Sequence, residues 1–204
     1  MRTPLMRCIA LSIAALALTA CGGSQSSSTV GNASEASTAG KASEVDVPQG
    51  VLADARQVRE EIRAEGGETT VGEWRIGYII EGAEPWYEPQ GKAYIFRQPA
   101  AGETHHIEIV PIEEKTGRTV PGAKITLQVI DSTGKTVETK PLNFYYAEFF
   151  HYANNFSIPA SGRYTLRATI EPPQFFRHGQ HHEQPALTKG ATAMFEDVHI
   201  DLTK

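Results

Sequence analysis

The chain has 204 residues, of which 40% are hydrophobic and 21% charged, and its formal net charge is −5. This length and composition suit one domain with a buried core and argue against a wholly disordered chain. The acidic balance argues against a general nucleic-acid binder and against a protein held on membranes by Lys and Arg. Both cysteines, Cys8 and Cys21, lie near the N-terminus. Zinc-finger cysteine sites, cysteine nucleophiles and iron–sulfur clusters are therefore excluded for the rest of the chain.

The first twenty residues have the pattern of a secretion signal. Two arginines, Arg2 and Arg7, precede an apolar run over residues 9–18 that is too short to span a membrane. The following Leu18-Thr19-Ala20-Cys21-Gly22 resembles the lipobox of bacterial lipoproteins, which implies a signal peptide over residues 1–20 and lipidation of Cys21. Glycine rather than aspartate after the cysteine favours the outer membrane. The alternative is an ordinary signal peptide that contains a cysteine by chance.

The next segment, residues 21–50, is rich in Ser, Gly, Ala and Thr. Such a composition cannot bury enough apolar surface to offset its ordering entropy, so we expect a flexible tether. The folded domain is then expected over residues 51–204.

This domain is predicted to open with one short helix. Over residues 51–65 the apolar residues Leu52, Ala55, Val58 and Ile62 recur at helical spacing, and two glycines follow at positions 66 and 67. From Trp74 onward, apolar and polar residues alternate with period two in short runs separated by turn residues. About seven to eight strands in an antiparallel β-sandwich are expected. The clearest alternating runs are 106–110, 125–130, 164–170 and 198–202.

Histidines and carboxylates in this domain are candidate metal ligands. His106 and Glu108 are two residues apart, so in a strand they share one face while Ile107 points to the core. An imidazole and a carboxylate so placed can reach one cation. The alternative is that they only decorate the solvent face of a half-buried strand, and His105 and His199 are interpreted as surface residues.

A second candidate is His151, which lies among aromatic residues. Seven of the seventeen aromatic residues fall between Phe144 and Phe156. A water-poor surround disfavours the charged imidazole, and a neutral imidazole is the form that binds metal. The alternatives are a core histidine that bonds to a backbone carbonyl and, for the aromatics, sandwich core or a dimer contact.

The remaining candidates lie in one segment late in the chain. Pro172 and Pro173 should end the preceding strand and hold His178 at the edge of the sandwich. His181 and His182 are expected in a mobile polar loop, as an auxiliary metal site at most. Each of these histidines is open to interpretation as an exposed loop residue.

Together these segments resemble the periplasmic high-affinity Fe2+ transport proteins, a family of immunoglobulin-like copper- and iron-binding proteins that accompany an inner-membrane iron permease. The resemblance rests on four segments in the family's order. They read His106-Ile107-Glu108, His151-Tyr152-Ala153-Asn154-Asn155, Ile170-Glu171-Pro172-Pro173 and Arg177-His178.

The resemblance implies an immunoglobulin-like all-β sandwich, a homodimer, and a metal site made of His106, Glu108, His151 and His178. Tyr152, Asn154 and Asn155 are expected to orient the imidazoles. The family also has a methionine ligand, and the matching position here is near Phe144, while the only methionine after the lipobox is Met194. Loss of a thioether leaves nitrogen and oxygen ligands, which suit copper(II) or iron(II), with zinc or manganese as further candidates.

Two hypotheses for function follow. The first is a lipid-anchored, periplasm-facing envelope protein that binds copper or iron and serves ferrous iron uptake with an inner-membrane permease, without catalysis and without nucleic acid. The second is a metal-free immunoglobulin-like lipoprotein that acts as an interaction or assembly module. An enzyme is least favoured, because no pairing of a nucleophile with a base is visible in the sequence.

Overall fold

The computed structural model describes residues 48–178 and 184–203. These residues form one helix and eleven strands, more strands than the seven or eight predicted, because short strands without clear alternation were not recognised. Cys21, most of the tether, His181 and His182 lie outside the described residues. The elements are α1 (Gln49–Glu65), β1 (Gly66–Val71), β2 (Trp74–Gly82), β3 (Trp86–Gln90), β4 (Ala93–Arg97), β5 (His105–Glu113), β6 (Lys124–Asp131), β7 (Thr136–Pro141), β8 (Asn143–Tyr146), β9 (Phe150–Phe156), β10 (Gly162–Glu171) and β11 (Ala191–Ile200).

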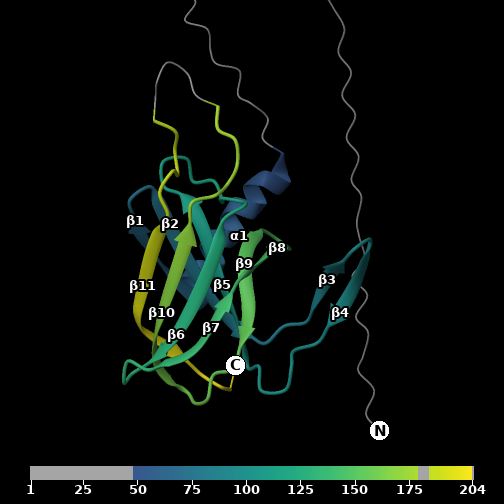
Figure 1. Cartoon of the computed structure of the whole chain (residues 1–204), viewed down its shortest axis with the longest axis vertical. Helices are drawn as coiled ribbons and strands as arrows, with labels where there is room; N and C mark the ends of the chain where they lie inside the picture. The colour runs from purple at the N-terminus through teal and green to yellow at the C-terminus, as the bar shows by residue number, and fades with distance from the viewer. Residues whose placement is uncertain (1–47, 179–183, 204) are drawn as a thin grey trace, which may run out of the picture. The chain divides into compact units, whose positions relative to one another are not determined.

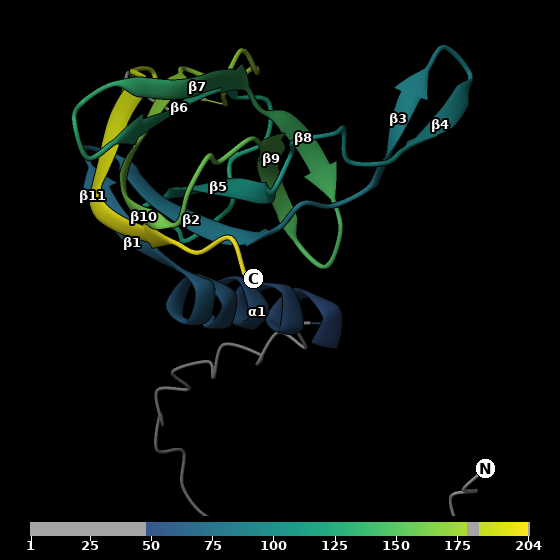
Figure 2. The same cartoon turned by 90° about the horizontal axis from the view of Figure 1, so that it is seen from below.

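Two antiparallel sheets face one another and form a sandwich (Figures 1 and 2). One sheet has five strands in the order β1-β2-β5-β9-β8, and the other has four in the order β11-β10-β6-β7. The predicted all-β sandwich with one helix is therefore confirmed. The centre of the five-stranded sheet is β5, which pairs with β2 on one side and β9 on the other.

The core lies between the sheets and follows from the period-two alternation in the sequence. In β10, for example, Leu166 and Ala168 are fully buried while Arg167 and Thr169 between them are exposed. Each fully buried Leu or Ile stabilises the fold by roughly 1.5–3 kcal/mol relative to an exposed side chain. This inner packing fixes the register of both sheets, and therefore also fixes which side chains reach the outer faces.

The helix α1 packs on the outer face of the five-stranded sheet (Figure 2). Val58 and Ile62 contact a second apolar cluster that includes Val110 and Phe149. Gly77 permits this close approach, because a Cβ atom there would lie 2.4 Å from Ile62 Cδ1. The predicted helix is confirmed, although Leu52 at its N-terminal end is 45% exposed.

No helix in the described ranges is both long and apolar enough to cross a membrane.

Strands β3 and β4 form a separate two-stranded arm that projects from the sandwich (Figures 1 and 2). The loop between them begins at Gly91, whose φ of +62° is accessible to glycine without strain. The sequence patterns did not reveal this hairpin. Its large apolar side chains are exposed in the isolated chain, namely Tyr87, Tyr94, Ile95 and Phe96.

Candidate metal centre

The first two candidate ligands lie on the outer face of β5. His106 and Glu108 alternate with Ile107, which is in the core between the sheets, so they share the face of Val110, which packs under α1. His106 is 1% exposed and Glu108 is 5% exposed. The alternative that these residues decorate a solvated face is therefore wrong, because both side chains are almost completely shielded from solvent.

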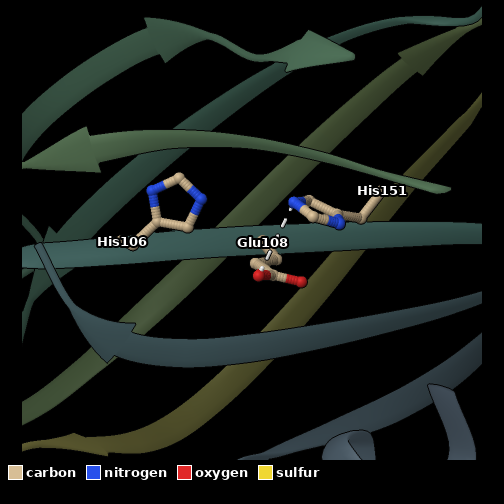
Figure 3. A group of neighbouring side chains, drawn as sticks. All are labelled: His106, Glu108 and His151. Carbon is tan, nitrogen blue, oxygen red and sulfur yellow. Dashed lines mark ion pairs between the residues drawn. The ribbon is translucent and has the colours of Figure 1, made fainter. Parts of the chain in front are cut away.

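The third candidate ligand is supplied by the neighbouring strand β9. His151 is also buried, and its Nε2 atom lies 3.7 Å from Glu108 Oε1 (Figure 3). One ligand atom from each of His106, Glu108 and His151 lies within 4.8 Å of the other two. The two imidazole planes are nearly perpendicular, at 89° with ring centroids 6.3 Å apart. These three residues form a group that could hold a metal ion.

The tautomer of His106 follows from its hydrogen bond to Asn155. The Asn155 side-chain amide donates from Nδ2 to the Glu84 carbonyl at 2.8 Å, and its Oδ1 accepts the Glu84 N–H at 3.2 Å. The orientation of the amide is thereby fixed. Its Oδ1 lies 2.9 Å from His106 Nδ1, so this nitrogen carries the proton and donates. His106 Nε2 therefore holds the free lone pair that a metal requires.

His151 is arranged in the same way by its own strand. Its Nδ1 donates to the Phe149 carbonyl oxygen at 3.3 Å, since a carbonyl can only accept. The Nε2 lone pair consequently faces Glu108. Anchoring one imidazole nitrogen by an acceptor so that the other can ligate is the usual arrangement around protein-bound metals.

Burial controls the protonation of the three candidate ligands. It lowers the pKa of His106, and together with the nearby His106 it lowers the pKa of His151 to about 4. Burial also raises the pKa of Glu108 to about 8, with help from Glu81 and other acidic neighbours. At neutral pH the imidazoles are thus neutral and Glu108 is protonated, so the 3.7 Å contact is not an ion pair in the metal-free protein.

Acidic side chains surround this group. The carboxylates that raise the pKa of Glu108 come from α1, from the end of β2 and from the loops that follow β2 and β8. They generate a negative potential at the site, which attracts cations and counteracts the cost of burying a positive ion. They are Glu61, Glu81, Glu84 and Glu148.

The donor chemistry fits a divalent cation. Within the described part of the chain, the buried atoms His106 Nε2 and Glu108 Oε2 have no hydrogen-bond partner. Unpaired buried polar atoms cost free energy, and a cation at this point would satisfy both at once. Two imidazoles and one carboxylate also leave at least one coordination position for water or another ligand.

Two aromatic side chains, Tyr145 and Trp86, pack beside His106 and His151. The sequence interpretation did not identify them. Tyr145 stacks on His151 with ring centroids 5.3 Å apart and planes 7° apart, and meets His106 edge-on at 5.5 Å. Trp86, at the base of the arm, lies 5.8 Å from Tyr145 and 6.3 Å from His106. The aromatic density around His151 was the available signal, but it did not distinguish Tyr145 from its neighbours.

The other aromatic residues of this segment divide between buried and exposed positions. Phe149, Tyr152 and Phe156 are buried, whereas Phe144 and Phe150 remain exposed. Tyr152 points into the core, where its hydroxyl contacts the Ala123 N–H and the Val120 carbonyl. Tyr152 therefore does not orient an imidazole.

Of the three residues expected to orient the imidazoles, only Asn155 contacts one. The Asn154 side chain bonds to backbone atoms of Pro141 and Asn155 instead. His105, expected at the surface, is 1% exposed and donates from Nε2 to the Asp201 carbonyl at 3.1 Å, so that expectation is wrong. It lies on the inner face because its neighbour His106 occupies the outer one. His199 is exposed, as expected.

The structure does not bring His178 to this group. Strand β10 ends at Glu171 before the two prolines, as predicted, and His178 is exposed in the loop that follows. It lines a hollow of about 330 Å³ together with Glu113, at the end of β5 opposite to His106.

Comparison with known proteins agrees with the β-sandwich fold and with the family resemblance inferred from the sequence. Residues 103–202 match the profile of the family described as "Fe2+ transport protein". FetP from uropathogenic E. coli strain F11 superposes with a TM-score of 0.52 at 20% identity, over 67% of this chain and 96% of FetP. Copper-reconstituted P19 from Campylobacter jejuni gives a TM-score of 0.53 at 17% identity, over 66% of this chain and 95% of P19. A comparison with curated protein sequences found no significant match.

At these identities the two solved structures establish the common fold. The family profile adds the sequence pattern, and it contains β5 and β9, the strands that carry His106, Glu108 and His151. The resemblance inferred from the sequence is therefore confirmed: over residues 103–202, this protein matches the Fe2+ transport protein family.

Proposed function

We propose that this protein binds one divalent metal ion through His106, Glu108 and His151, and that it serves ferrous iron transport in the periplasm-facing cell envelope. The observation that carries the proposal is the convergence of three buried ligand atoms within 4.8 Å, two of them on residues with unpaired buried atoms. The match to the Fe2+ transport protein profile supports the role in transport. We propose binding and delivery rather than catalysis.

The donor set favours copper(II) or iron(II) as the bound ion. Nitrogen and oxygen ligands without a thioether follow the usual divalent order, in which copper(II) binds most tightly in vitro and zinc or manganese are further candidates. Met194 lies on β11 of the other sheet and bonds to Arg167, so it supplies no sulfur to this group. P19 in its copper-reconstituted form supports copper as the first ion to test.

The N-terminal part of the chain supplies the proposed location. A signal peptide over residues 1–20, a lipid on Cys21 and a tether over residues 21–50 would hold the domain of residues 51–204 on a membrane. The glycine after Cys21 supports the outer membrane, from where the domain would exchange metal with an inner-membrane iron permease.

We also propose that the protein is a homodimer, with a second copy covering its exposed aromatic surfaces. One such surface is the β3–β4 arm, and the other is the edge strand β8 with the start of β9. Clusters of exposed aromatic side chains of this kind mark interaction sites more often than free surface. On β8 and β9 they are Phe144, Tyr146 and Phe150.

Titration calorimetry with Cu(II) tests the proposal on the detergent-purified protein and on single variants. His151→Ala should weaken binding by at least about tenfold, because loss of a direct ligand costs no less than loss of a residue that orients one. His199→Ala is the matched control, since it removes an exposed histidine from the opposite sheet and should leave affinity unchanged. His178→Ala should also leave the Cu(II) affinity unchanged, because His178 does not lie with the three proposed ligands.

Two results would contradict this proposal. Absence of stoichiometric Cu(II), Fe(II) or Zn(II) binding by the wild type would favour the metal-free interaction module. Equal losses in His151→Ala and His199→Ala would show that surface histidines bind the metal nonspecifically.

A further inference from the structure

The base of the β3–β4 arm contacts His106 directly and reaches His151 through Tyr145. Trp86 opens β3 and Arg97 ends β4, and the two residues are cross-strand partners. The Arg97 guanidinium carbon lies 4.0 Å above the Trp86 ring, a cation–π distance. Trp86 in turn meets Tyr145 at 88°, and Tyr145 stacks on His151. A continuous series of ring contacts therefore joins the arm to His151.

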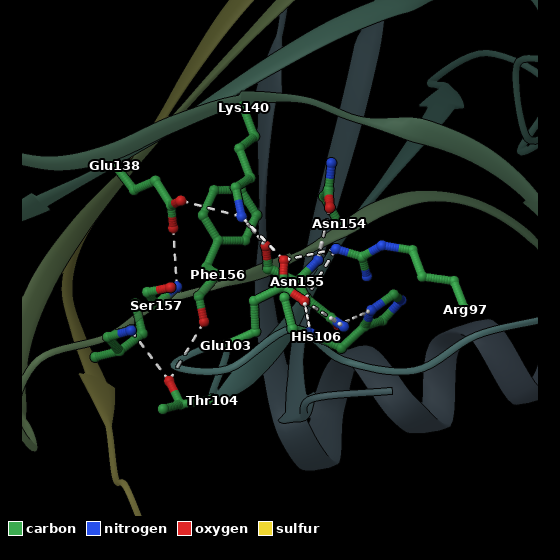
Figure 4. Close-up of polar contacts among 12 residues, drawn as sticks. Arg97, Glu103, Thr104, His106, Glu138, Lys140, Asn154, Asn155, Phe156 and Ser157 are labelled. Atoms are coloured by element: carbon green, nitrogen blue, oxygen red, sulfur yellow. Dashed lines mark hydrogen bonds and ion pairs between the residues drawn. The ribbon is translucent and has the colours of Figure 1, made fainter. Parts of the chain in front are cut away.

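A polar route joins the same arm to His106 (Figure 4). Arg97 Nη2 donates to both carboxylate oxygens of Glu103, at 2.9 and 3.1 Å. Asn155 Nδ2 lies 3.4 Å from Glu103 Oε2, and Asn155 Oδ1 accepts from His106 Nδ1 at 2.9 Å. The orientation of His106 thus depends on Asn155, which also contacts the carboxylate that Arg97 binds.

The unpaired buried atoms gather along these two routes. Within residues 48–178 and 184–203, four buried side-chain nitrogen or oxygen atoms have no hydrogen-bond partner. Three of them belong to Arg97, His106 and Tyr145, which the contacts above connect, and the fourth belongs to Glu108. Native proteins keep few such atoms, and bound water or an ion commonly supplies the partner of those that remain.

We propose that Arg97 and Glu103 are positioning residues of the metal centre, and that through them the order of the β3–β4 arm is coupled to metal occupancy. This inference rests on the proposed metal-binding function. An isolated two-stranded hairpin is only marginally stable, so the arm depends on its base contacts. A metal ion that fixes His106 and His151 restrains Asn155 and Tyr145, and these restrain Arg97 and Trp86. By linkage, an ordered arm must strengthen metal binding in return.

The experiment measures the metal site and the arm separately. Calorimetry gives the Cu(II) affinity, electron paramagnetic resonance reports the ligand geometry of bound Cu(II), and hydrogen–deuterium exchange reports the order of residues 86–97. In the wild type, saturating Cu(II) should slow exchange in the arm. Arg97→Ala should weaken Cu(II) binding by about tenfold, alter the resonance spectrum and abolish the slowing even at saturating Cu(II).

Lys140→Met is the matched control. Lys140 also pairs with Glu103, at 3.3 Å, and carries the same charge as Arg97, but it comes from β7 and is not part of the arm. It should retain slowing of arm exchange by Cu(II). If Arg97→Ala does not fold, Glu103→Gln replaces it, because the glutamine amide is uncharged and has one acceptor oxygen where the carboxylate offers two to Arg97 and Asn155.

The outcomes separate this inference from the proposed function. A wild type that binds no Cu(II) contradicts the proposed function, and the inference fails with it. A wild type that binds Cu(II) without any slowing in the arm overturns the inference alone. Equal loss of arm protection in Arg97→Ala and Lys140→Met also overturns the inference. The loss would then follow from removing any positive charge near Glu103, and not from breaking a contact with the arm.

Discussion

Glu108 is the residue on which the proposed metal binding depends most directly. It lies on a buried face of β5, where desolvation and the surrounding carboxylates raise its pKa to about 8. A metal ion must displace its proton at neutral pH, whereas the imidazoles already have low pKa values and need no deprotonation. The carboxylate therefore sets the pH range of binding.

The apparent affinity for Zn(II) should rise as pH increases and level off above the pKa of Glu108. The sign follows because only the deprotonated carboxylate binds, so each pH unit below about 8 should cost close to tenfold in affinity. Competition with a chelator of known affinity, from about pH 6 to about pH 9, measures this slope. Glu108→Gln should bind more weakly with a nearly flat profile. A wild-type midpoint near ~6.5, the ordinary range of histidine, would instead identify an imidazole as the controlling group.

At the scale of single residues, the sequence predicted three of the candidate ligands that converge, together with His178, which does not, and it did not predict their surroundings. His106, Glu108 and His151 were identified from a period-two pattern, an aromatic segment and a family resemblance, and the structure brings them together. Arg97 and Glu103 were not identified, because their contacts with the site run through Trp86 and Asn155. Residue spacing along a strand carries no information about contacts between loops and a projecting arm.

At the scale of elements, the junction between α1 and β1 positions the helix that packs on the outer face of the five-stranded sheet, over Val110 and Phe149. The chain leaves the helix at Gly66 and pairs at once with β2. A Cβ atom at Gly66 would lie 1.7 Å from the Tyr78 carbonyl oxygen. Only glycine permits this approach, so the predicted stop signal of the helix is also the first residue of a strand.

Gly66→Ala should therefore destabilise the domain by about 1–3 kcal/mol, the usual cost of forcing extra volume into a packed region. Thermal denaturation followed by circular dichroism measures the effect. Gly50→Ala is the control, because it makes the same chemical change in α1 where nothing lies within 4 Å. It should leave the melting temperature unchanged or raise it slightly. Equal melting temperatures for the two variants would contradict the role assigned to Gly66.

Several elements escaped the sequence patterns for identifiable reasons. β3 and β4 project from the sandwich, so neither has a buried face to produce apolar–polar alternation. β5 was recognised as a strand, but its burial on both faces from His105 to Ile112 depends on tertiary packing that no periodicity reveals. β10, with one face on the core and one exposed, was predicted accurately.

At the scale of the whole molecule, we propose that a lipid on Cys21 attaches the protein to the membrane. Cys21→Ala should therefore leave the protein in the soluble fraction after cell lysis, because it removes the acyl attachment point. Ultracentrifugation of lysates followed by immunodetection measures this. Cys8→Ala is the control and should remain with the membranes. Sedimentation of Cys21→Ala with the membranes would contradict the lipid anchor.

The proposed dimer is tested by a charge placed on the arm. Phe96 is 49% exposed and lies among other exposed apolar residues, so Phe96→Asp should convert a dimer to a monomer by burying an uncompensated charge in the interface. Phe176→Asp is the control, since Phe176 is fully exposed in the loop after β10. Analytical ultracentrifugation distinguishes the species. A wild type that remains monomeric at high concentration would contradict the dimer.

Periodicity along the chain was enough to predict the class of fold and the two candidate metal ligands that share one strand. Alternation with period two selects the inner face of each strand, and that choice necessarily places His106 and Glu108 together on the other face. Contacts between distant segments were needed to bury His106 and Glu108, to bring His151 on β9 within 3.7 Å of Glu108, and to place His178 elsewhere. The reason is physical: strand periodicity is a local property, whereas desolvation, pKa and coordination depend on which distant segments pack against the strand.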